Sequence, residues 1–262
     1  MNALLFHRYV ALGDSFTEGV GDPDPSRPNG LRGWADRVAE ALADRAQRAD
    51  SEFGYANLAI RGRKLGAILD EQVDPALALQ PDLVTVYAGA NDLLRPKVDI
   101  DALARRYDEA VGTLTASGAV VGLFTAFDPG SQGLFARLRG RFALYNEQVR
   151  EIADKHGAVV LDSWRMRPDR PETMWAEDRL HLGPAGHQVV AIAVLEALGV
   201  PHDLALLEAP APVQRTAREV RATNLAWART HAAPWVHRRL TGRSSGDGIA
   251  PKRPALAPIG PC

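Results

Sequence analysis

The sequence has almost no cysteine and no long hydrophobic run. Its only cysteine, Cys262, is the last of 262 residues, so no intramolecular disulfide can form. A cysteine in that place also lacks the three following residues of a prenylation signal. No run approaches the roughly 18 apolar residues of a membrane span, and residues 1–8 lack the basic region and long apolar core of a secretory signal. We therefore expect a cytoplasmic location.

Net charge is also nearly absent. The formal net charge is −1 at pH 7, so the whole molecule offers no electrostatic attraction to nucleic acid, and we expect no nucleic-acid partner. The small total hides an uneven distribution, since residues 205–262 carry nine basic and three acidic side chains, a net charge of +6. Residues 1–204 carry a net charge of −7. A hydrophobic content of 46% is ordinary for a globular protein with a buried core.

Apolar segments typical of buried strands alternate five times with segments of helical periodicity. The expected strands are residues 9–12, 55–60, 82–88, 119–125 and 158–162. The expected helices are residues 34–50, 64–79, 100–117, 141–156 and 184–198. Such alternation predicts an α/β fold in which right-handed crossovers join parallel strands and helices cover both faces of the sheet.

The end of the chain differs in composition from the rest. We expect a folded body over residues 1–204 and a basic helical appendage over 205–240, with a linker-like break at 209–212 and a further short helix at 234–240. Residues 241–262 are rich in Gly, Ser and Pro, which predicts disorder. The appendage is interpreted as a solvated element packed on the acidic body. Contact with a membrane surface or a partner is the less favoured alternative.

One serine follows the first expected strand. The strand ends at Gly13-Asp14-Ser15, which leaves a hydroxyl at the carboxyl end of a strand, where open α/β sheets bind their ligands. Ser15 is a candidate nucleophile if a base lies nearby in space. The alternative is an ordinary turn, because Gly, Asp and Ser are all common turn residues.

An aspartate and a histidine precede the last expected helix. Asp178 and His181 are three residues apart, so the carboxylate can hold the Nδ1–H of the imidazole and leave Nε2 free to face a nucleophile. The alternative is that Asp178 marks the helix entry and His181 lies on the surface. A helix start at Pro184 fits both interpretations.

Two further residues follow the second and third expected strands. The side-chain amide of Asn91 can donate to a developing oxyanion, although a turn asparagine is the simpler interpretation. Gly62 lets a backbone N–H approach a ligand closely, a weak signal by itself. Together with Ser15 and the Asp178–His181 pair, these residues would lie on one rim of the sheet. A nucleophile, a base with its orienting carboxylate, and hydrogen-bond donors are the groups that acyl transfer requires.

The four segments together resemble the four sequence blocks of the SGNH hydrolase family, also called GDSL-type esterases and lipases. The segments are Gly13-Asp14-Ser15, Gly62 with the preceding Asn57-Leu58-Ala59, Gly89-Ala90-Asn91-Asp92, and Asp178 with His181. Their order and rough spacing match the family over residues 5–199, and Phe16 stands where the family name implies leucine. The resemblance implies a flavodoxin-like three-layer α/β/α sandwich with a five-stranded parallel sheet.

The resemblance also implies a role for each matched residue. Ser15 would be the nucleophile and would give its backbone N–H to the oxyanion hole. Gly62 would add a second backbone N–H, and Asn91 a side-chain N–H. His181 would be the general base, oriented by Asp178.

These roles predict a serine esterase that acts on small-molecule esters through an acyl-serine, with no cofactor and no metal. Three other histidines, His156, His187 and His202, lack the cluster spacing of a zinc site, and His187 is expected to be structural. Asp14 and Asp92 are interpreted as residues that structure their loops.

A thioesterase, a carbohydrate deacetylase or a lysophospholipase on the same site is an alternative function. A non-catalytic acyl- or sugar-binding module is an alternative of another class. Three loops, at 22–30, 128–140 and 163–177, are expected to shape the pocket.

Overall fold

The computed structural model of the chain describes residues 5–131, 135–166, 171–208, 216–234, 241 and 244–260, with the backbone alone at 171–172. The linker expected at 209–212, all but the first residue of the short helix expected at 234–240, and Cys262 lie outside the described residues.

Within the described residues, six strands form one central sheet in the order β5-β4-β3-β1-β2-β6. Their bounds are Arg8–Leu12 (β1), Gly54–Asn57 (β2), Leu83–Val86 (β3), Val120–Phe124 (β4), Val159–Leu161 (β5) and Arg253–Ala257 (β6). Strands β1 to β5 pair in parallel, as their alternation with helices predicts.

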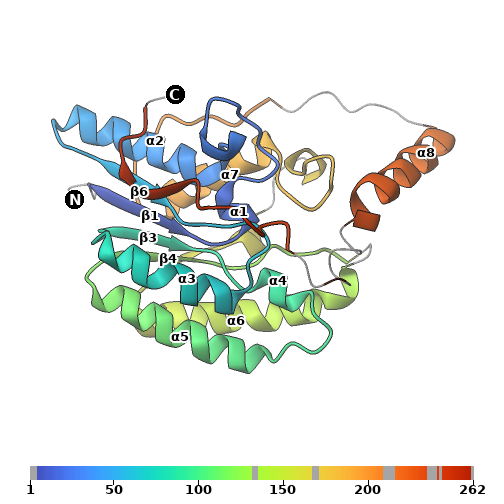
Figure 1. Ribbon diagram of the computed structural model, residues 1–262, viewed down its shortest axis with the longest axis horizontal. Helices are drawn as coiled ribbons and strands as arrows, with labels where there is room; N and C mark the ends of the chain where they lie inside the picture. The colour runs from blue at the N-terminus through green and yellow to red at the C-terminus, as the bar shows by residue number, and fades with distance from the viewer. Residues whose placement is uncertain are drawn as a thin grey trace.

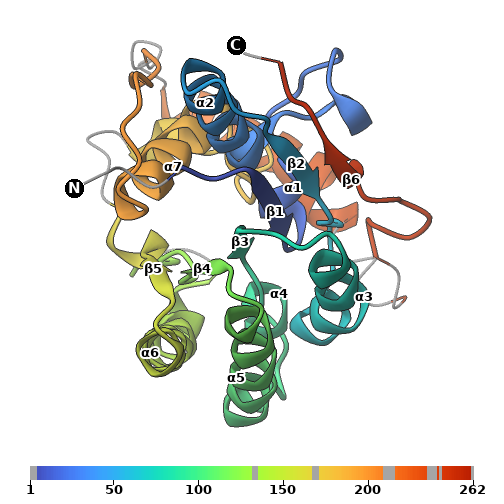
Figure 2. The same cartoon turned by 90° about the vertical axis from the view of Figure 1, so that its left-hand side faces the viewer.

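Helices cover both faces of this sheet (Figure 1). Their bounds are Ser15–Glu18 (α1), Gly33–Arg48 (α2), Leu65–Ala78 (α3), Ala90–Leu93 (α4), Ile100–Ala116 (α5), Arg139–His156 (α6), Pro184–Ala197 (α7) and Ala217–Trp227 (α8). Helices α2 and α7 lie on one face, and α3 to α6 lie on the other, as Figure 2 shows from the end of the sheet. The predicted three-layer α/β/α architecture is therefore confirmed.

The central strand β1 shows how the two layers are held. Tyr9 and Ala11 point to one face and pack with α2 and α7, whereas Val10 and Leu12 point to the other and pack with α3, α5 and α6. All four side chains are completely buried. A strand buried on both faces reads as a continuous apolar run, which is why the parallel strands could be recognised in the sequence.

The expectation of five strands is wrong, because the sheet has a sixth, β6, which pairs antiparallel with β2. The disorder expected over 241–262 therefore does not hold for residues 253–257. The Gly, Ser and Pro content suggested no stable structure, but two side chains of this segment are buried. Ile259 enters the core on the α2 and α7 face, and the side chain of Lys252 is completely buried.

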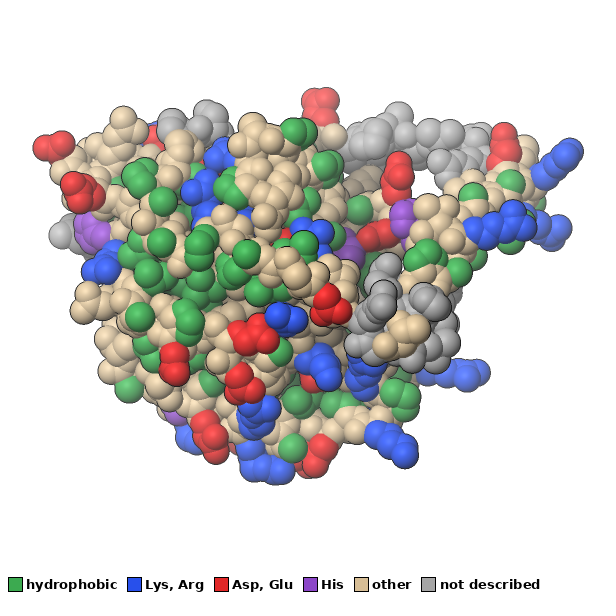
Figure 3. All heavy atoms as spheres, in the orientation of Figure 1, with side chains coloured by type: hydrophobic (Ala, Val, Ile, Leu, Met, Phe, Trp, Pro, Cys, Tyr) green, Lys and Arg blue, Asp and Glu red, His purple; other side chains and the backbone are tan. Residues whose placement is uncertain are grey.

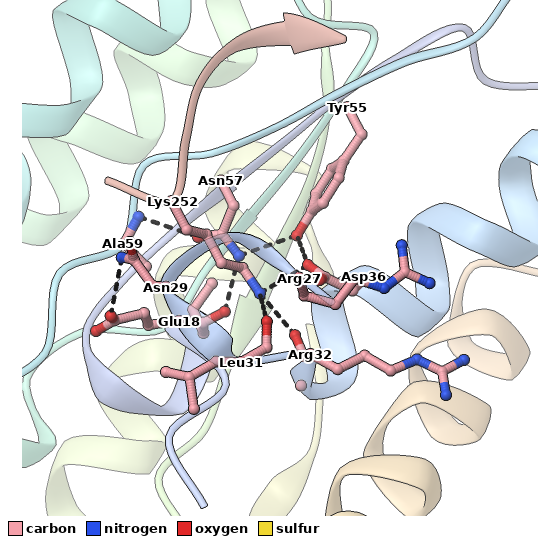
Figure 4. Close-up of polar contacts among 12 residues, drawn as sticks. Glu18, Arg27, Asn29, Leu31, Arg32, Asp36, Tyr55, Asn57, Ala59 and Lys252 are labelled. Carbon is pink, nitrogen blue, oxygen red and sulfur yellow. Dashed lines mark hydrogen bonds and ion pairs between the residues drawn. The ribbon is translucent and has the colours of Figure 1, made fainter. Parts of the chain in front are cut away.

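Lys252 anchors the C-terminal segment (Figure 4). Its ammonium lies 2.8 Å from Oδ1 of Asp36 on α2 and donates to the carbonyl oxygens of Leu31 and Arg32 at 3.3 and 2.6 Å. The hydroxyl of Tyr55 donates to the same Asp36 oxygen at 2.9 Å. A buried ammonium is tolerated only when it is paired and hydrogen-bonded in this way. The C-terminal segment is thus part of the folded body.

Helix α8 lies in the segment expected to form the basic appendage, and it extends away from the sheet (Figure 1). A capping box between Thr216 and Glu219 begins it. Among the helices that the structure describes, none has the length and apolar content required to cross a membrane. The cytoplasmic location stays a prediction.

Candidate active site

The turn after β1 requires glycine and is fixed by a buried glutamine. A Cβ atom added to Gly13 would lie 2.4 Å from the Thr17 hydroxyl and 2.9 Å from the Tyr87 carbonyl oxygen, so no larger residue fits. The side chain of Gln72 on α3 accepts a hydrogen bond from the Gly13 N–H at 2.8 Å and donates to the Gly13 carbonyl at 2.9 Å. These contacts fix the backbone just before Ser15.

Ser15 is the first residue of α1. The Asp14 side chain caps this short helix by accepting from the Phe16 N–H at 3.0 Å, in line with its predicted loop-structuring role. The Phe16 ring is buried against other aromatic rings, among them Tyr87 at 4.4 Å and Phe124 at 5.2 Å between centroids. Phenylalanine at this position packs in the core, and the serine hydroxyl is left at the sheet edge.

The histidine and aspartate expected beside Ser15 do lie there. His181 Nε2 is 3.1 Å from Ser15 Oγ, and His181 Nδ1 is 2.5 Å from Asp178 Oδ2. Asp178 Oδ1 accepts from the backbone N–H groups of Leu180 and His181, both at 2.9 Å. The three side chains form one hydrogen-bonded row from hydroxyl to carboxylate.

The charge of Asp178 is held by its hydrogen bonds. Partial burial acts to raise its pKa, but the hydrogen bonds from His181 and Leu180 and the attraction to the imidazole outweigh burial and lower the pKa to about 2. The carboxylate is therefore ionised at neutral pH and can stabilise a positive charge on the imidazole.

A tight turn presents Asp178 and His181. The Ala176 N–H donates to the His181 carbonyl at 2.9 Å, and the Arg179 N–H donates to the Ala176 carbonyl at 2.9 Å. Arg179 has φ of +56°, a left-handed conformation that is uncommon for a residue with a side chain. The turn therefore contains a residue that needs support from its surroundings.

Asn91 lies in α4, directly after β3, and its amide is already engaged. Its Nδ2 donates to Asp14 Oδ2 at 2.8 Å and to the Arg63 carbonyl at 3.0 Å. Asp14 is 3% exposed, and burial raises its pKa to about 7 although the Phe16 N–H opposes the shift. Asp92, next to Asn91, accepts from the Leu65 N–H at 2.8 Å and so structures the start of α3, as predicted.

The loop that carries Gly62 is tied to α1. Glu18 is completely buried, and its carboxylate accepts from the Arg61 N–H at 2.8 Å and from the Arg61 guanidinium at 2.5 Å. Gly62 has φ of +76°, a conformation that favours glycine. Within the described part of the chain, the backbone N–H groups of Ser15 and Gly62 donate no hydrogen bond to any residue. The surroundings of the two residues differ, because Ser15 lines the substrate pocket whereas Gly62 does not line it and lies against the side chain of Ser244.

A pocket of about 1410 Å³ opens over Ser15, Asn91 and His181. The loops expected at 128–140 and 163–177 both contribute to its lining, but no described residue of the 22–30 loop does. A further part of the wall comes from α8 and the π-helix Ala228–Ala232 that follows it, which the sequence did not indicate. In Figure 3 the surface is indented between the body and α8.

Several residues that shape this site were not predicted. Gln72 and Glu18 lie in helices, where polar residues usually face solvent, and no local pattern shows that they are buried. Helical spacing placed His187 in the last helix, and it is structural as predicted, since its Nδ1 accepts from the Trp34 N–H at 3.1 Å. Burial lowers the pKa of His187 to about 4.

Comparison with known proteins places the chain in a family. The model of the GDSL-like Lipase/Acylhydrolase family matches residues 11–189. Comparison with curated proteins found no match.

Several solved structures share the fold. LAE5, described as an alpha/beta hydrolase enzyme from the metagenome of Lake Arreo, Spain, is 23% identical, with a TM-score of 0.60 over 74% of this chain and 95% of its own. The acetylxylan esterase Axe2 from Geobacillus stearothermophilus is 22% identical, with a TM-score of 0.61 over the same shares. The psychrotrophic esterase EstA from Pseudoalteromonas sp. is 18% identical, with a TM-score of 0.55 over 72% of this chain and 95% of its own. The chain therefore belongs to the GDSL-like lipase/acylhydrolase family of SGNH hydrolases and is a serine ester hydrolase.

Proposed function

We propose that this hydrolase cleaves small-molecule carboxylic esters through an acyl intermediate on Ser15, with His181 as the general base and Asp178 as its orienting carboxylate. The observation that carries the proposal is the unbroken row Ser15 Oγ, His181 Nε2 and Nδ1, and Asp178 Oδ2, with separations of 3.1 and 2.5 Å. A nucleophile, a base and an orienting group in this order are the requirements of serine catalysis.

In the first half of the reaction, His181 Nε2 takes the hydroxyl proton as Ser15 Oγ bonds to the ester carbonyl carbon. The carbonyl electron pair moves to oxygen, which gives a tetrahedral oxyanion. When the oxyanion collapses, the bond to the alcohol oxygen breaks, and His181 gives its proton to the leaving alcohol. Water then repeats the sequence on the acyl-serine, which releases the carboxylic acid and restores the Ser15 hydroxyl.

Three groups are proposed to stabilise the oxyanion. The Ser15 N–H donates to no described residue and Ser15 lines the pocket, which supports its role. The Gly62 N–H also donates to no described residue, but the Ser244 side chain lies against Gly62, so this loop would have to move for Gly62 to reach the oxyanion. The Asn91 amide is bonded to Asp14 and to the Arg63 carbonyl, so it would share one of these N–H groups with the oxyanion. Preorganised donors of this kind each contribute about 10²-fold or more to the rate.

The direct test is hydrolysis of p-nitrophenyl acetate and butyrate by the wild type and by Ser15→Ala. We expect a loss in kcat of about 10⁴-fold or more. Ser117→Ala is the matched control, because this exposed serine ends α5 and does not line the pocket. Equal turnover by the wild type and Ser15→Ala would remove Ser15 from the mechanism and would favour a non-catalytic acyl- or sugar-binding role for the site.

The pocket lining gives one reason to include acetylated carbohydrates in the substrate panel. Trp175 lines the pocket, is 38% exposed and meets Phe127 edge to face at 5.9 Å. Such a ring offers a flat apolar surface to a sugar, and two of the similar structures are named as acetyl xylan esterases. Turnover of acetylated xylan beside simple esters, thioesters and lysophospholipids would separate the remaining alternatives.

A further inference from the structure

The backbone of the Asp178–His181 turn is bonded to α8. The indole Nε1 of Trp227, the last residue of α8, donates to the Asp178 carbonyl oxygen at 2.9 Å. Asp178 supplies its carboxylate to His181, so this hydrogen bond holds the peptide next to the catalytic pair. Trp227 lies beyond residues 11–189, the part of the chain that the family model matches.

The neighbouring residue of the same turn is held by α8 as well. The Arg179 guanidinium lies over the Trp227 ring at 5.1 Å and donates from Nη1 to Asn224 Oδ1 at 2.8 Å. Asn224 and Trp227 are three residues apart and so share one face of α8. These contacts fix the side chain of Arg179, whose backbone has φ of +56°. Since a left-handed non-glycine residue costs free energy, the turn needs such contacts to keep its shape.

The same side of the helix closes the substrate pocket. The pocket lining includes Thr223, Ala226 and Trp227 of α8, and Thr230 and His231 of the π-helix that follows. The opposite side of α8 faces solvent, with Leu225 53% exposed. One side of α8 therefore contacts the active-site turn and the pocket, and the other side faces solvent.

From these contacts we infer that α8 is a positioning element of the active site and a determinant of substrate size. Trp227 and Asn224 hold the Asp178–His181 turn in its working conformation, and the pocket wall formed by Thr223, Ala226 and Trp227 limits the size of the group that the ester carries. The inference rests on the proposed function of Ser15, His181 and Asp178. It assigns a role to a segment outside the matched family range.

The positioning role and the pocket-wall role of α8 predict different changes in kcat and KM. Loss of positioning lowers kcat for every ester, because acylation and deacylation both use the His181–Asp178 pair. Loss of the wall changes KM for a long ester relative to a short one, because the longer group has more apolar surface to bury against the wall. A helix that merely adds stability would change neither quantity in a folded enzyme.

The experiment compares four full-length variants with p-nitrophenyl acetate and p-nitrophenyl octanoate. Trp227→Phe keeps a ring but loses the N–H donor, and should lower kcat about fivefold on both esters, the factor that corresponds to one hydrogen bond of about 1 kcal/mol. Asn224→Ala should lower kcat about two- to fivefold by releasing Arg179. Trp227→Ala should also change the ratio of the two KM values by about threefold or more. Leu225→Ala, on the solvent side, should match the wild type within about twofold.

Ser15→Ala, measured in parallel, separates the two proposals. If Ser15→Ala is inactive while Trp227→Phe and Asn224→Ala keep wild-type kcat on both esters, the positioning role of α8 is refuted and the proposed function stands. If Ser15→Ala keeps its turnover, the proposed function is refuted, and the inference on α8, which rests on it, is refuted as well. Thermal unfolding identifies any variant that does not fold. If Trp227→Ala does not fold, Asn224→Ala still tests the positioning role, because the side chain of Asn224 is exposed and its loss should leave the fold intact. A loss in Leu225→Ala equal to that in Trp227→Phe would also overturn the inference, because helix stability would then explain both.

Discussion

The ion pair between Lys252 and Asp36 gives the sharpest prediction about stability. Both side chains are completely buried, and their charged atoms are 2.8 Å apart. Lys252→Met keeps a side chain of similar length and removes the ammonium. Asp36 then keeps Tyr55 as a hydrogen-bond donor but has lost its charge partner. Leaving one member of a buried pair uncompensated costs about 3–5 kcal/mol. That cost is a large share of the roughly 5–15 kcal/mol by which a domain is stable.

The pH dependence of this loss has a definite sign. Burial raises the pKa of Asp36, and attraction to Lys252 opposes the shift. Without Lys252 the folded-state pKa rises further, so the carboxyl takes up a proton more readily in the folded variant than in the unfolded chain. A raised folded-state pKa gives stability that is present at low pH and lost as the pH rises through it. The deficit of Lys252→Met should therefore be smaller at about pH 5 than at about pH 8.

Urea unfolding of the wild type, Lys252→Met, Asp36→Asn and the double variant tests this reasoning. The double variant removes both charges and should recover most of the loss, since a neutral pair leaves no buried charge. Lys97→Met, an exposed lysine, is the matched control and should change the free energy of unfolding by less than about 0.5 kcal/mol. A Lys252→Met protein as stable as the control, or a double variant no better than the single, would refute the reasoning.

Three further predictions concern the site. Asn91→Ala should lower kcat about 10²-fold if its amide serves the oxyanion, and a loss below about threefold in steady-state assays would contradict that role. Asp178→Asn should lower kcat by about 10³-fold or more, because a neutral amide cannot stabilise a charged His181, and near-normal turnover would contradict the proposed orienter. Burial raises the folded-state pKa of Asp14 to about 7 from the ordinary 3.8, so the wild type should lose stability as the pH rises through about 7. Asp14→Asn should flatten that dependence, and parallel urea-midpoint curves for both proteins between about pH 5 and pH 8 would show that Asp14 is not its source.

The sequence was informative where local pattern and long-range structure agree. Strands β1 and β3 are apolar on both faces, so their residues identify them without knowledge of their neighbours. Once the strands are parallel, their carboxyl ends meet at one edge of the sheet. That rule predicts that Ser15, Gly62, Asn91 and His181 converge at this edge, and the pocket lining includes all of them except Gly62.

Strand β6 shows why the rest was not predictable. It contains Pro254 and follows a Gly- and Ser-rich segment, a composition that favours disorder and is tolerated in a strand at a sheet edge. Its order depends on Lys252 meeting Asp36, more than 200 residues away in the sequence. The pairing of Trp227 with the Asp178 carbonyl is likewise a contact between distant segments. Neither leaves a signal in the local sequence.

The central claim, that Ser15 is activated by His181, is tested most directly by labelling with a fluorophosphonate followed by peptide mass spectrometry. The account predicts stoichiometric phosphonylation of the peptide that carries Ser15, loss of esterase activity in proportion, and labelling slowed by at least about 10²-fold in His181→Ala. Inactivation with the label on another residue, or an unlabelled Ser15 in an inactivated enzyme, would contradict it.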